Sequence, residues 1–167
     1  MGERNNLMQA ESITKWLDDY YKSLFPDAYI QRIDGKGLLQ IEMQKVGIDV
    51  QILRQNTGYS IYIDEKINYT DFDTLVLEEY SKWEDKIPGW LEKDNVSDFI
   101  SYAIVSKKLI YFLPYPILRI AYFKNKDEWL KQYKRKFAPN FNYQTSFIPV
   151  PWEELKRAMC ECMQKES

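Results

Sequence analysis

Histidine is absent from this chain of 167 residues. Its absence excludes acid–base catalysis by imidazole, Ser-His-Asp triads, and the common zinc and di-iron sites that need histidine ligands. Cysteine is also scarce, because the chain has only Cys160 and Cys162 with one residue between them. Such a pair makes a poor disulfide framework, so we expect reduced thiols in a cytoplasmic protein. Carboxylates and lysine remain as the main groups for any catalysis.

Glycine and proline are sparse, with 6 and 7 residues, so the composition is not that of a disordered chain. No apolar run approaches the roughly 18 residues of a membrane span, so we expect no membrane partner. The formal net charge of −2 offers no global basic field for coating nucleic acid, but it leaves room for a local basic groove. The length fits one domain, residues 1–167.

Periodic apolar residues predict the helices of the chain. In residues 8–24, apolar side chains recur with the i, i+3, i+4 spacing of an amphipathic helix, and Pro26 ends the pattern. Further helices are predicted at 117–124, 126–136 and 152–164.

Alternating apolar and polar residues predict the strands. Beside the hairpin described next, they are predicted at 29–33, 74–81 and 146–150, with a second hairpin over 99–113. Residues 38–45 fit either a helical turn or a strand, and their alternation favours a strand. The order of helix, strands, helices, strand and helix predicts an α/β or α+β domain.

Residues 47–66, GIDVQILRQNTGYSIYIDEK, predict a β-hairpin, because two alternating apolar runs flank a glycine-containing turn. If the hairpin is symmetric, Arg54 lies opposite Tyr59. Asp49 then falls opposite Asp64 on the neighbouring strand. This register places two acids side by side, which needs a chemical explanation.

One face of this hairpin carries Asp49, Gln51, Asp64 and Lys66, and the other is apolar apart from Glu65. Opposed carboxylates on adjacent strands sit roughly 5 Å apart and repel each other when both are ionised. A divalent cation removes this conflict, and hard oxygen ligands select Mg²⁺ or Mn²⁺. Lys66 can orient or deprotonate an attacking water and offset charge on a phosphate. The alternative is a structural Asp–Lys salt bridge on a sheet face.

The spacing of 47–49 and 63–66 on a hairpin resembles the core motif of the PD-(D/E)XK nuclease superfamily, the restriction-endonuclease-like fold. Segments farther along the chain are similar to a group of uncharacterised bacterial and phage proteins assigned to that superfamily. These segments are 64–66, 75–78, 89–91 and 97–102. The resemblance implies a single domain with a central mixed β-sheet flanked by helices.

The resemblance also implies a role for each residue of the hairpin. Asp49 and Asp64 would bind Mg²⁺ or Mn²⁺, and Lys66 would activate or position water. The peptide carbonyl of Glu65 would be a further metal ligand. Gln51 would orient a phosphate or a water. These roles describe metal-dependent hydrolysis of a phosphodiester bond.

An acid on the first helix often completes such sites in this superfamily. Glu11 is our candidate for that acid, in preference to Asp18 or Asp19. Glu78 is an alternative site acid, although a solvated or paired charge on a strand is the simpler interpretation.

One local basic run suggests contact with nucleic acid. Lys131, Lys134 and Arg135 share one face of the helix predicted over 126–136 and could bind the phosphate backbone. A solvated helix face is the alternative. The many tyrosines and tryptophans fit core and sheet packing better than base stacking.

Three functions follow from the sequence. The first is a Mg²⁺-dependent nuclease acting on DNA, with a homodimer as a possible assembly. The second is a catalytically inactive member of the fold that binds nucleic acid or a protein partner. The third is an unrelated binding protein in which Asp49, Asp64 and Lys66 form a salt-bridge set. The first expects these three side chains to converge on an open face, and the third expects Lys66 to be paired and the acids dispersed.

Overall fold

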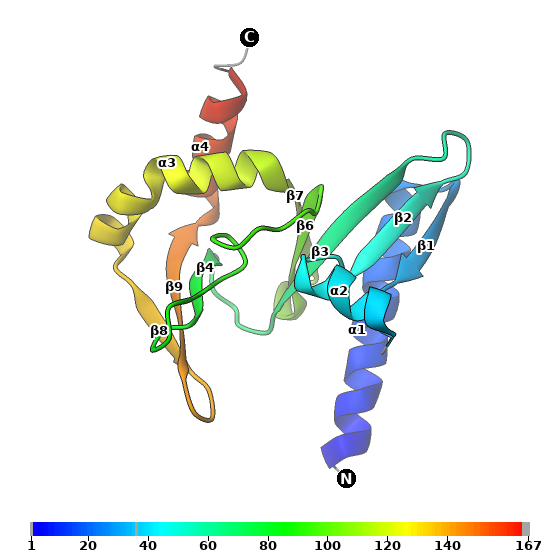
Figure 1. Ribbon diagram of the computed structural model, residues 1–167, viewed down its shortest axis with the longest axis horizontal. Helices are drawn as coiled ribbons and strands as arrows, with labels where there is room; N and C mark the ends of the chain where they lie inside the picture. The colour runs from blue at the N-terminus through cyan, green and yellow to red at the C-terminus, as the bar shows by residue number, and fades with distance from the viewer. Residues whose placement is uncertain (1, 36, 165–167) are drawn as a thin grey trace.

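Two β-sheets and four α-helices form the mixed α+β domain in the computed structural model, which describes residues 2–35 and 37–164 (Figure 1). Sheet A lies with α1 and α2 on one side of the view, and sheet B lies with α3 and α4 on the other. The helices are α1 (Gly2–Leu24), α2 (Leu38–Lys45), α3 (Tyr115–Tyr133) and α4 (Trp152–Gln164). None of these helices is both long enough and apolar enough to cross a lipid bilayer.

Sheet A has five strands in the order β1-β2-β3-β6-β7. They are β1 (Ala28–Arg32), β2 (Val50–Arg54), β3 (Ser60–Asn68), β6 (Phe99–Ile104) and β7 (Leu109–Pro114). The pair β3–β6 is parallel, and the other neighbours are antiparallel, so the sheet is mixed. A parallel pair needs a long crossover connection, and here that crossover carries the first two strands of sheet B.

Sheet B has four antiparallel strands in the order β5-β4-β9-β8. They are β5 (Ile87–Pro88), β4 (Thr74–Lys82), β9 (Gln144–Pro151) and β8 (Lys136–Pro139). The central pair joins β4 to β9 across most of their length, from Thr74 opposite Pro151 to Tyr80 opposite Ser146. Sheet B is therefore assembled from segments far apart in the chain.

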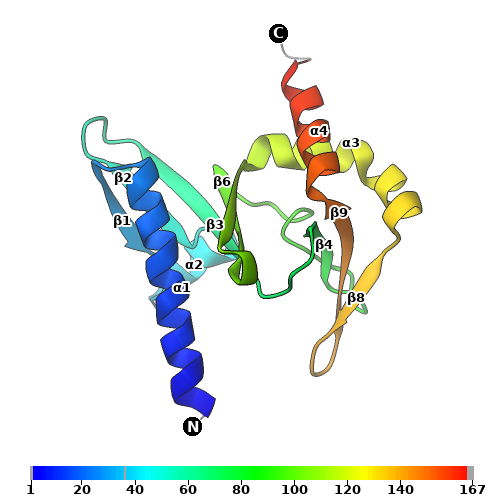
Figure 2. The same ribbon diagram turned by 180° about the vertical axis from the view of Figure 1, so that it is seen from behind.

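Helix α1 packs on one face of sheet A, as Figure 2 shows from behind. Its buried side chains recur at i+4 spacing, which gives the helix one apolar stripe. The stripe meets the side chains that alternate inward on β2 and β3. This first core consists mainly of Ile13, Leu17, Tyr21, Val50, Ile52, Ile63 and Ala103.

A second core fills the space between the opposite face of sheet A, sheet B, and helices α3 and α4. Ile100 and Tyr102 contribute from β6, and Leu75 and Leu77 contribute from β4. Trp129 of α3 is 1% exposed within it. Sheet A is thus covered on both faces, and the crossover between β3 and β6 carries part of the second cover.

Several predicted elements are confirmed. The first hairpin has the predicted register, since Gln51 pairs with Tyr62 and the Arg54 amide donates to the Tyr59 carbonyl at 3.0 Å. The second hairpin is the β6–β7 pair, joined by a 3₁₀ turn at Val105–Lys107. The last helix has the predicted bounds.

Two predictions about elements are wrong. Residues 38–45 form helix α2, and because none of its residues is buried, their alternation does not reflect a core face. The two helices predicted over 117–136 are one helix, in which Asn125 donates its side-chain amide to the Ala121 carbonyl at 2.8 Å. The helix ends at Tyr133 because Lys134 has a φ of 58°, outside the helical region. The mixed sheet expected of a single α+β domain is sheet A, and sheet B is a second, antiparallel sheet.

Candidate active site

The hairpin brings Asp49 and Asp64 together as its register requires. The Asp49 amide donates to the Ile63 carbonyl at 2.9 Å, which aligns Asp49 with the residue next to Ile63 on β3. The carboxylate of Asp49 then accepts a hydrogen bond from the Glu65 amide at 2.8 Å. The two acids are therefore cross-strand neighbours on one face of sheet A, and that face looks toward the second core.

Asp64 is buried, with 1% of its surface exposed. One carboxylate oxygen binds Lys66 Nζ, and the other accepts a hydrogen bond from Asn95 Nδ2 at 2.8 Å. Burial raises the pKa of Asp64 to about 6; the neighbouring Asp49 also raises this pKa, and Lys66 opposes both effects. The positive charge of one lysine does not fully offset the cost of burying this carboxylate beside another acid.

Lys66 lies between the two sheets, with 26% of its side chain exposed. Its ammonium group is 5.8 Å from the centre of the Trp90 ring. Glu78 of β4 reaches the same region, because its carboxylate accepts the Trp90 amide at 3.3 Å. Burial raises the pKa of Glu78, while the nearby charge of Lys66 lowers it. The structure thus brings Glu78, the alternative acid, toward Lys66.

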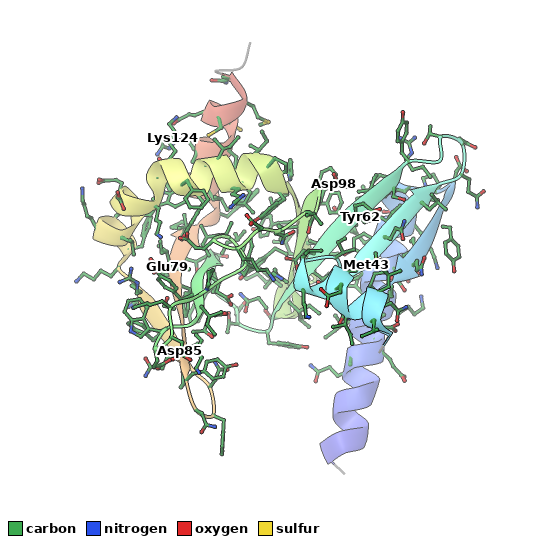
Figure 3. The ribbon with its side chains drawn as sticks, in the orientation of Figure 1. Met43, Tyr62, Glu79, Asp85, Asp98 and Lys124 are labelled. Carbon is green, nitrogen blue, oxygen red and sulfur yellow. The ribbon has the colours of Figure 1, made fainter. Side chains whose placement is uncertain are left out.

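The segment 89–98 covers the site on the face of sheet A that carries Asp64. Gly47 makes room for it, because a Cβ on Gly47 would lie 2.3 Å from the side-chain amide nitrogen of Asn95. The φ of Gly47 is +83°, a left-handed conformation that favours glycine. At the other end, Asp98 accepts the amide of Tyr62 at 2.8 Å, and both residues are labelled in Figure 3. These contacts fix Asn95 over Asp64.

Sequence reasoning missed Asn95 as a site residue. It contacts Asp64 across 31 positions of sequence, and its side-chain oxygen Oδ1 accepts a hydrogen bond from the Ser97 amide at 2.8 Å. No local spacing links an asparagine in this segment to the hairpin. Only the parallel β3–β6 pairing, with Asp64 opposite Ile100, brings the segment over the acids.

Several predicted site residues are not gathered with this pair. The side chain of Glu65 lies on the opposite face of sheet A, where it accepts hydrogen bonds from Tyr21 at 2.7 Å and Arg32 at 2.9 Å. Glu11 is exposed on α1, which covers that same opposite face, so it does not complete the site. Asp18 is paired with Arg32 at 2.9 Å. The role predicted for the Glu65 carbonyl stays a prediction.

Gln51 lies on the predicted face but makes a different contact. Its amide nitrogen donates to the Ser60 hydroxyl at 2.7 Å, within the hairpin. Gln51 also pairs with Tyr62 across the strands, two positions from the Asp49–Asp64 pair. In this conformation it supports the hairpin.

The basic residues predicted to share a helix face do not do so. Helix α3 ends at Tyr133, so Lys134 and Arg135 lie beyond it and only Lys131 is on the helix. Arg135 forms two hydrogen bonds to the buried Glu79, at 2.6 and 2.8 Å. Figure 3 labels Glu79 on β4, beneath α3. Arg135 is therefore part of an internal ion pair.

The acids of the site fit a metal bound by few protein ligands. Among the residues that the structure describes, no group of three or more acids or cysteines could hold a metal ion. Asp49 and Asp64 remain as an adjacent pair of oxygen donors. Mg²⁺ commonly binds one or two carboxylates and takes its other ligands from water and substrate phosphates. The donor set is therefore consistent with Mg²⁺ or Mn²⁺ bound together with substrate.

Comparison with known protein families, with curated proteins and with solved structures finds no match for this chain. The resemblance to the PD-(D/E)XK superfamily accordingly stays a prediction, and the function must be argued from the geometry of the site.

Proposed function

We propose that this chain is a metal-dependent nuclease that hydrolyses phosphodiester bonds, with DNA as the expected substrate. The observation that carries the proposal is the cross-strand pair of Asp49 and Asp64, with Lys66 bound to the buried acid. Two adjacent acids and a lysine on one sheet face are the groups that such hydrolysis needs.

Asp49 and Asp64 would hold Mg²⁺ or Mn²⁺ between their carboxylates. When bound, the metal supplies a polarised phosphate oxygen and a water of lowered pKa. Lys66, which binds Asp64 in the structure, would turn its ammonium group toward the attacking water or the scissile phosphate. The ring of Trp90 lies beside the ammonium group of Lys66.

The electrostatics of Asp64 support this proposal. A carboxyl whose pKa is raised to about 6 by burial and by a neighbouring acid gains from a second positive charge. A divalent cation shared with Asp49 is the simplest source of that charge. A salt-bridge set built only for stability would not place the second acid beside the first.

One observation favours the alternative, a catalytically inactive nuclease-fold protein that binds nucleic acid or a protein. Both oxygens of Asp64 already have partners, Lys66 and Asn95. A member of the fold that had lost its metal could keep this arrangement as a permanent network. The two functions differ in whether divalent metal binds at the acids.

The decisive experiment incubates the purified chain with plasmid, single-stranded DNA and RNA, in Mg²⁺, Mn²⁺ or EDTA. We expect cutting that requires the divalent ion and falls by about a hundredfold in Lys66→Ala. Lys15→Ala is the matched control, because Lys15 is exposed on α1, where it pairs with Asp19. Absence of metal-dependent cutting with every substrate would overturn the nuclease proposal.

A second measurement separates the two functions. Mn²⁺ should raise the melting temperature of the wild-type chain but not that of Asp49→Asn, since binding to the folded state stabilises it. No Mn²⁺-dependent shift, together with binding of nucleic acid or of a protein partner, would support the inactive alternative. The expected homodimer stays a prediction that size-exclusion chromatography with light scattering can check.

A further inference from the structure

The outer face of sheet B carries an open groove that the candidate active site does not use. Its volume is about 680 Å³. On β4, Leu75 and Leu77 point into the second core, so the alternate residue Val76 faces outward into the groove. The β3–β4 connection, which crosses between the sheets in Figures 1 and 2, forms one wall, and β8 lies at the far side.

Two phenylalanine rings face this groove. Phe72 of the β3–β4 connection is 67% exposed. Phe147 of β9 is partly buried in the floor. Phe137 of β8 also borders the groove, but it pairs with the buried Ser146, so its ring lies on the opposite face of sheet B, packed against Trp83 with ring centres 5.3 Å apart. An exposed ring on the wall of a groove is suited to a flat ligand that stacks.

The charges around the groove suit an anion. Lys136 is the only charged residue among those that line it, and the other polar lining groups are uncharged amides and hydroxyls. The nearest acids in sequence, Asp71 and Asp73, are both paired with Lys107. A groove with one cation and no acid, in a chain of net charge −2, complements a phosphate backbone.

Two strands connect the groove to the candidate active site. On β3, Asn68 lines the groove and lies two residues after Lys66, on the same face of the strand. On β4, Val76 lies two residues before Glu78. Glu78 in turn pairs directly with Phe147 of the groove floor. A chain lying in the groove would therefore lead to the acids and the lysine.

We propose that this groove binds a single-stranded segment of nucleic acid and leads it to Asp49, Asp64 and Lys66. The inference rests on the proposed nuclease function and names its substrate class. Exposed rings stack on unpaired bases of any sequence, while a cation contacts the backbone. A duplex hides its base faces between neighbouring pairs, so the exposed ring of Phe72 has nothing to stack on there.

The test measures binding without metal, so that cutting plays no part. Fluorescence anisotropy in EDTA compares labelled single strands of about 16 nucleotides, as oligo-dT and as oligo-U, with a duplex of the same length. We expect both single strands to bind more tightly than the duplex. The ratio of the oligo-dT and oligo-U affinities then shows whether DNA or RNA is preferred.

Variants of the rings test the groove itself. Phe72→Ala should weaken single-strand binding by roughly tenfold, whereas Phe137→Ala should not, because that ring lies on the opposite face of sheet B. Phe141→Ala is the matched control, because Phe141 is 98% exposed on the β8–β9 turn and does not line the groove. Phe72→Leu keeps apolar volume but removes the ring, and Phe72→Trp restores a stacking surface. Melting curves verify that each variant is folded.

The outcomes separate the two proposals. Loss of binding in Phe72→Leu and its recovery in Phe72→Trp support the groove. Equal binding by Phe72→Ala and the Phe141→Ala control, or duplex binding as tight as single-strand binding, overturns it. If cutting depends on metal but the variants that lack the Phe72 ring bind single strands as tightly as wild type, the nuclease proposal stands and the groove proposal is refuted. If binding depends on the ring but no cutting occurs, the groove proposal stands and the nuclease proposal is refuted.

Discussion

Asp64 and Glu65 are neighbours on β3, yet their carboxylates lie on opposite faces of sheet A and are held differently. Glu65 receives hydrogen bonds from Tyr21 and Arg32, and Arg32 is further paired with Asp18. Asp64 is buried beside Asp49 with one cation, Lys66. Hydrogen bonds within the fold satisfy the carboxylate of Glu65. The carboxylate of Asp64 still lacks positive charge, which is the state expected of a group that works with a ligand.

The largest expected difference between the two faces is in catalysis. Asp64→Asn and Glu65→Gln each remove one negative charge from adjacent positions. We expect metal-dependent cutting to fall by about a thousandfold in Asp64→Asn, because a metal ligand is lost. Folded Glu65→Gln should keep near wild-type activity in the same assay. Equal losses in both variants would contradict the division of roles.

Removing the cation that pairs with each carboxylate should affect stability in the opposite order, so that the loss is larger beside Glu65 than beside Asp64. Arg32→Ala leaves the partly buried Glu65 without its charged partner and should lower the free energy of unfolding by about 3 kcal/mol. Lys66→Ala should cost about 1 kcal/mol or less, because removing the lysine leaves an acid that can take up a proton. Urea denaturation of both variants measures the difference. A greater loss for Lys66→Ala would make its pairing with Asp64 mainly structural.

The pH dependence of stability distinguishes Asp64 from a carboxylate of the internal network. The raised pKa of Asp64 means that its contribution is fully present below its unfolded value of 3.8 and is lost as pH rises through about 6. In EDTA, wild type should therefore lose about 2 kcal/mol relative to Asp64→Asn over that range. A flat difference in unfolding free energy would refute the raised pKa.

Glu79 provides the contrasting titration. Burial acts to raise its pKa, but hydrogen bonds from Arg135 and Lys126 outweigh burial and lower it below 4.5. Its contribution is present above 4.5 and is lost as pH falls through the lowered value. Wild type should thus lose its advantage over Glu79→Gln as the solution is acidified. The same denaturation series measures both effects, with opposite signs.

The smallest expected effect concerns Asn95. Asn95→Ala removes the hydrogen bond to Asp64 and should cost about 1 kcal/mol of stability. The same change frees one carboxylate oxygen, so Mn²⁺ should bind about fivefold more tightly. Calorimetric titration of Mn²⁺ measures this, with Asn142→Ala on the β8–β9 turn as the control. Weaker binding would show that Asn95 assists the metal site.

The hairpin could be predicted because the residues that specify it lie close together in the sequence. Alternation and one turn placed Asp49 opposite Asp64, and the pairing of Gln51 with Tyr62 confirms that register. The same alternation put the Glu65 side chain on the apolar face, where the structure places it. Period-two patterning fixes which face each strand residue occupies.

The rest of the site depends on contacts that no local pattern encodes. Asn95 and Glu78 reach the acids only through the crossover between β3 and β6, with close approaches at Gly47 and Gly89 that leave no room for a Cβ. Glu11 was predicted from its place on the first helix, but tertiary contacts decide on which face of a sheet a helix packs. The buried side chains of α1 pack this helix on the face of sheet A opposite to the acids.

The parallel pairing of β3 with β6 also has a consequence for kinetics. Asp49 and Asp64 lie on one hairpin, and hairpins form within microseconds. The parallel pairing of Ile63 with Phe99 needs the long connection that carries Asn95 to close, and closure of such loops slows folding. We therefore expect the two acids to be assembled before Asn95 covers them. Hydrogen exchange should find segment 89–98 opening while the β2–β3 ladder stays protected.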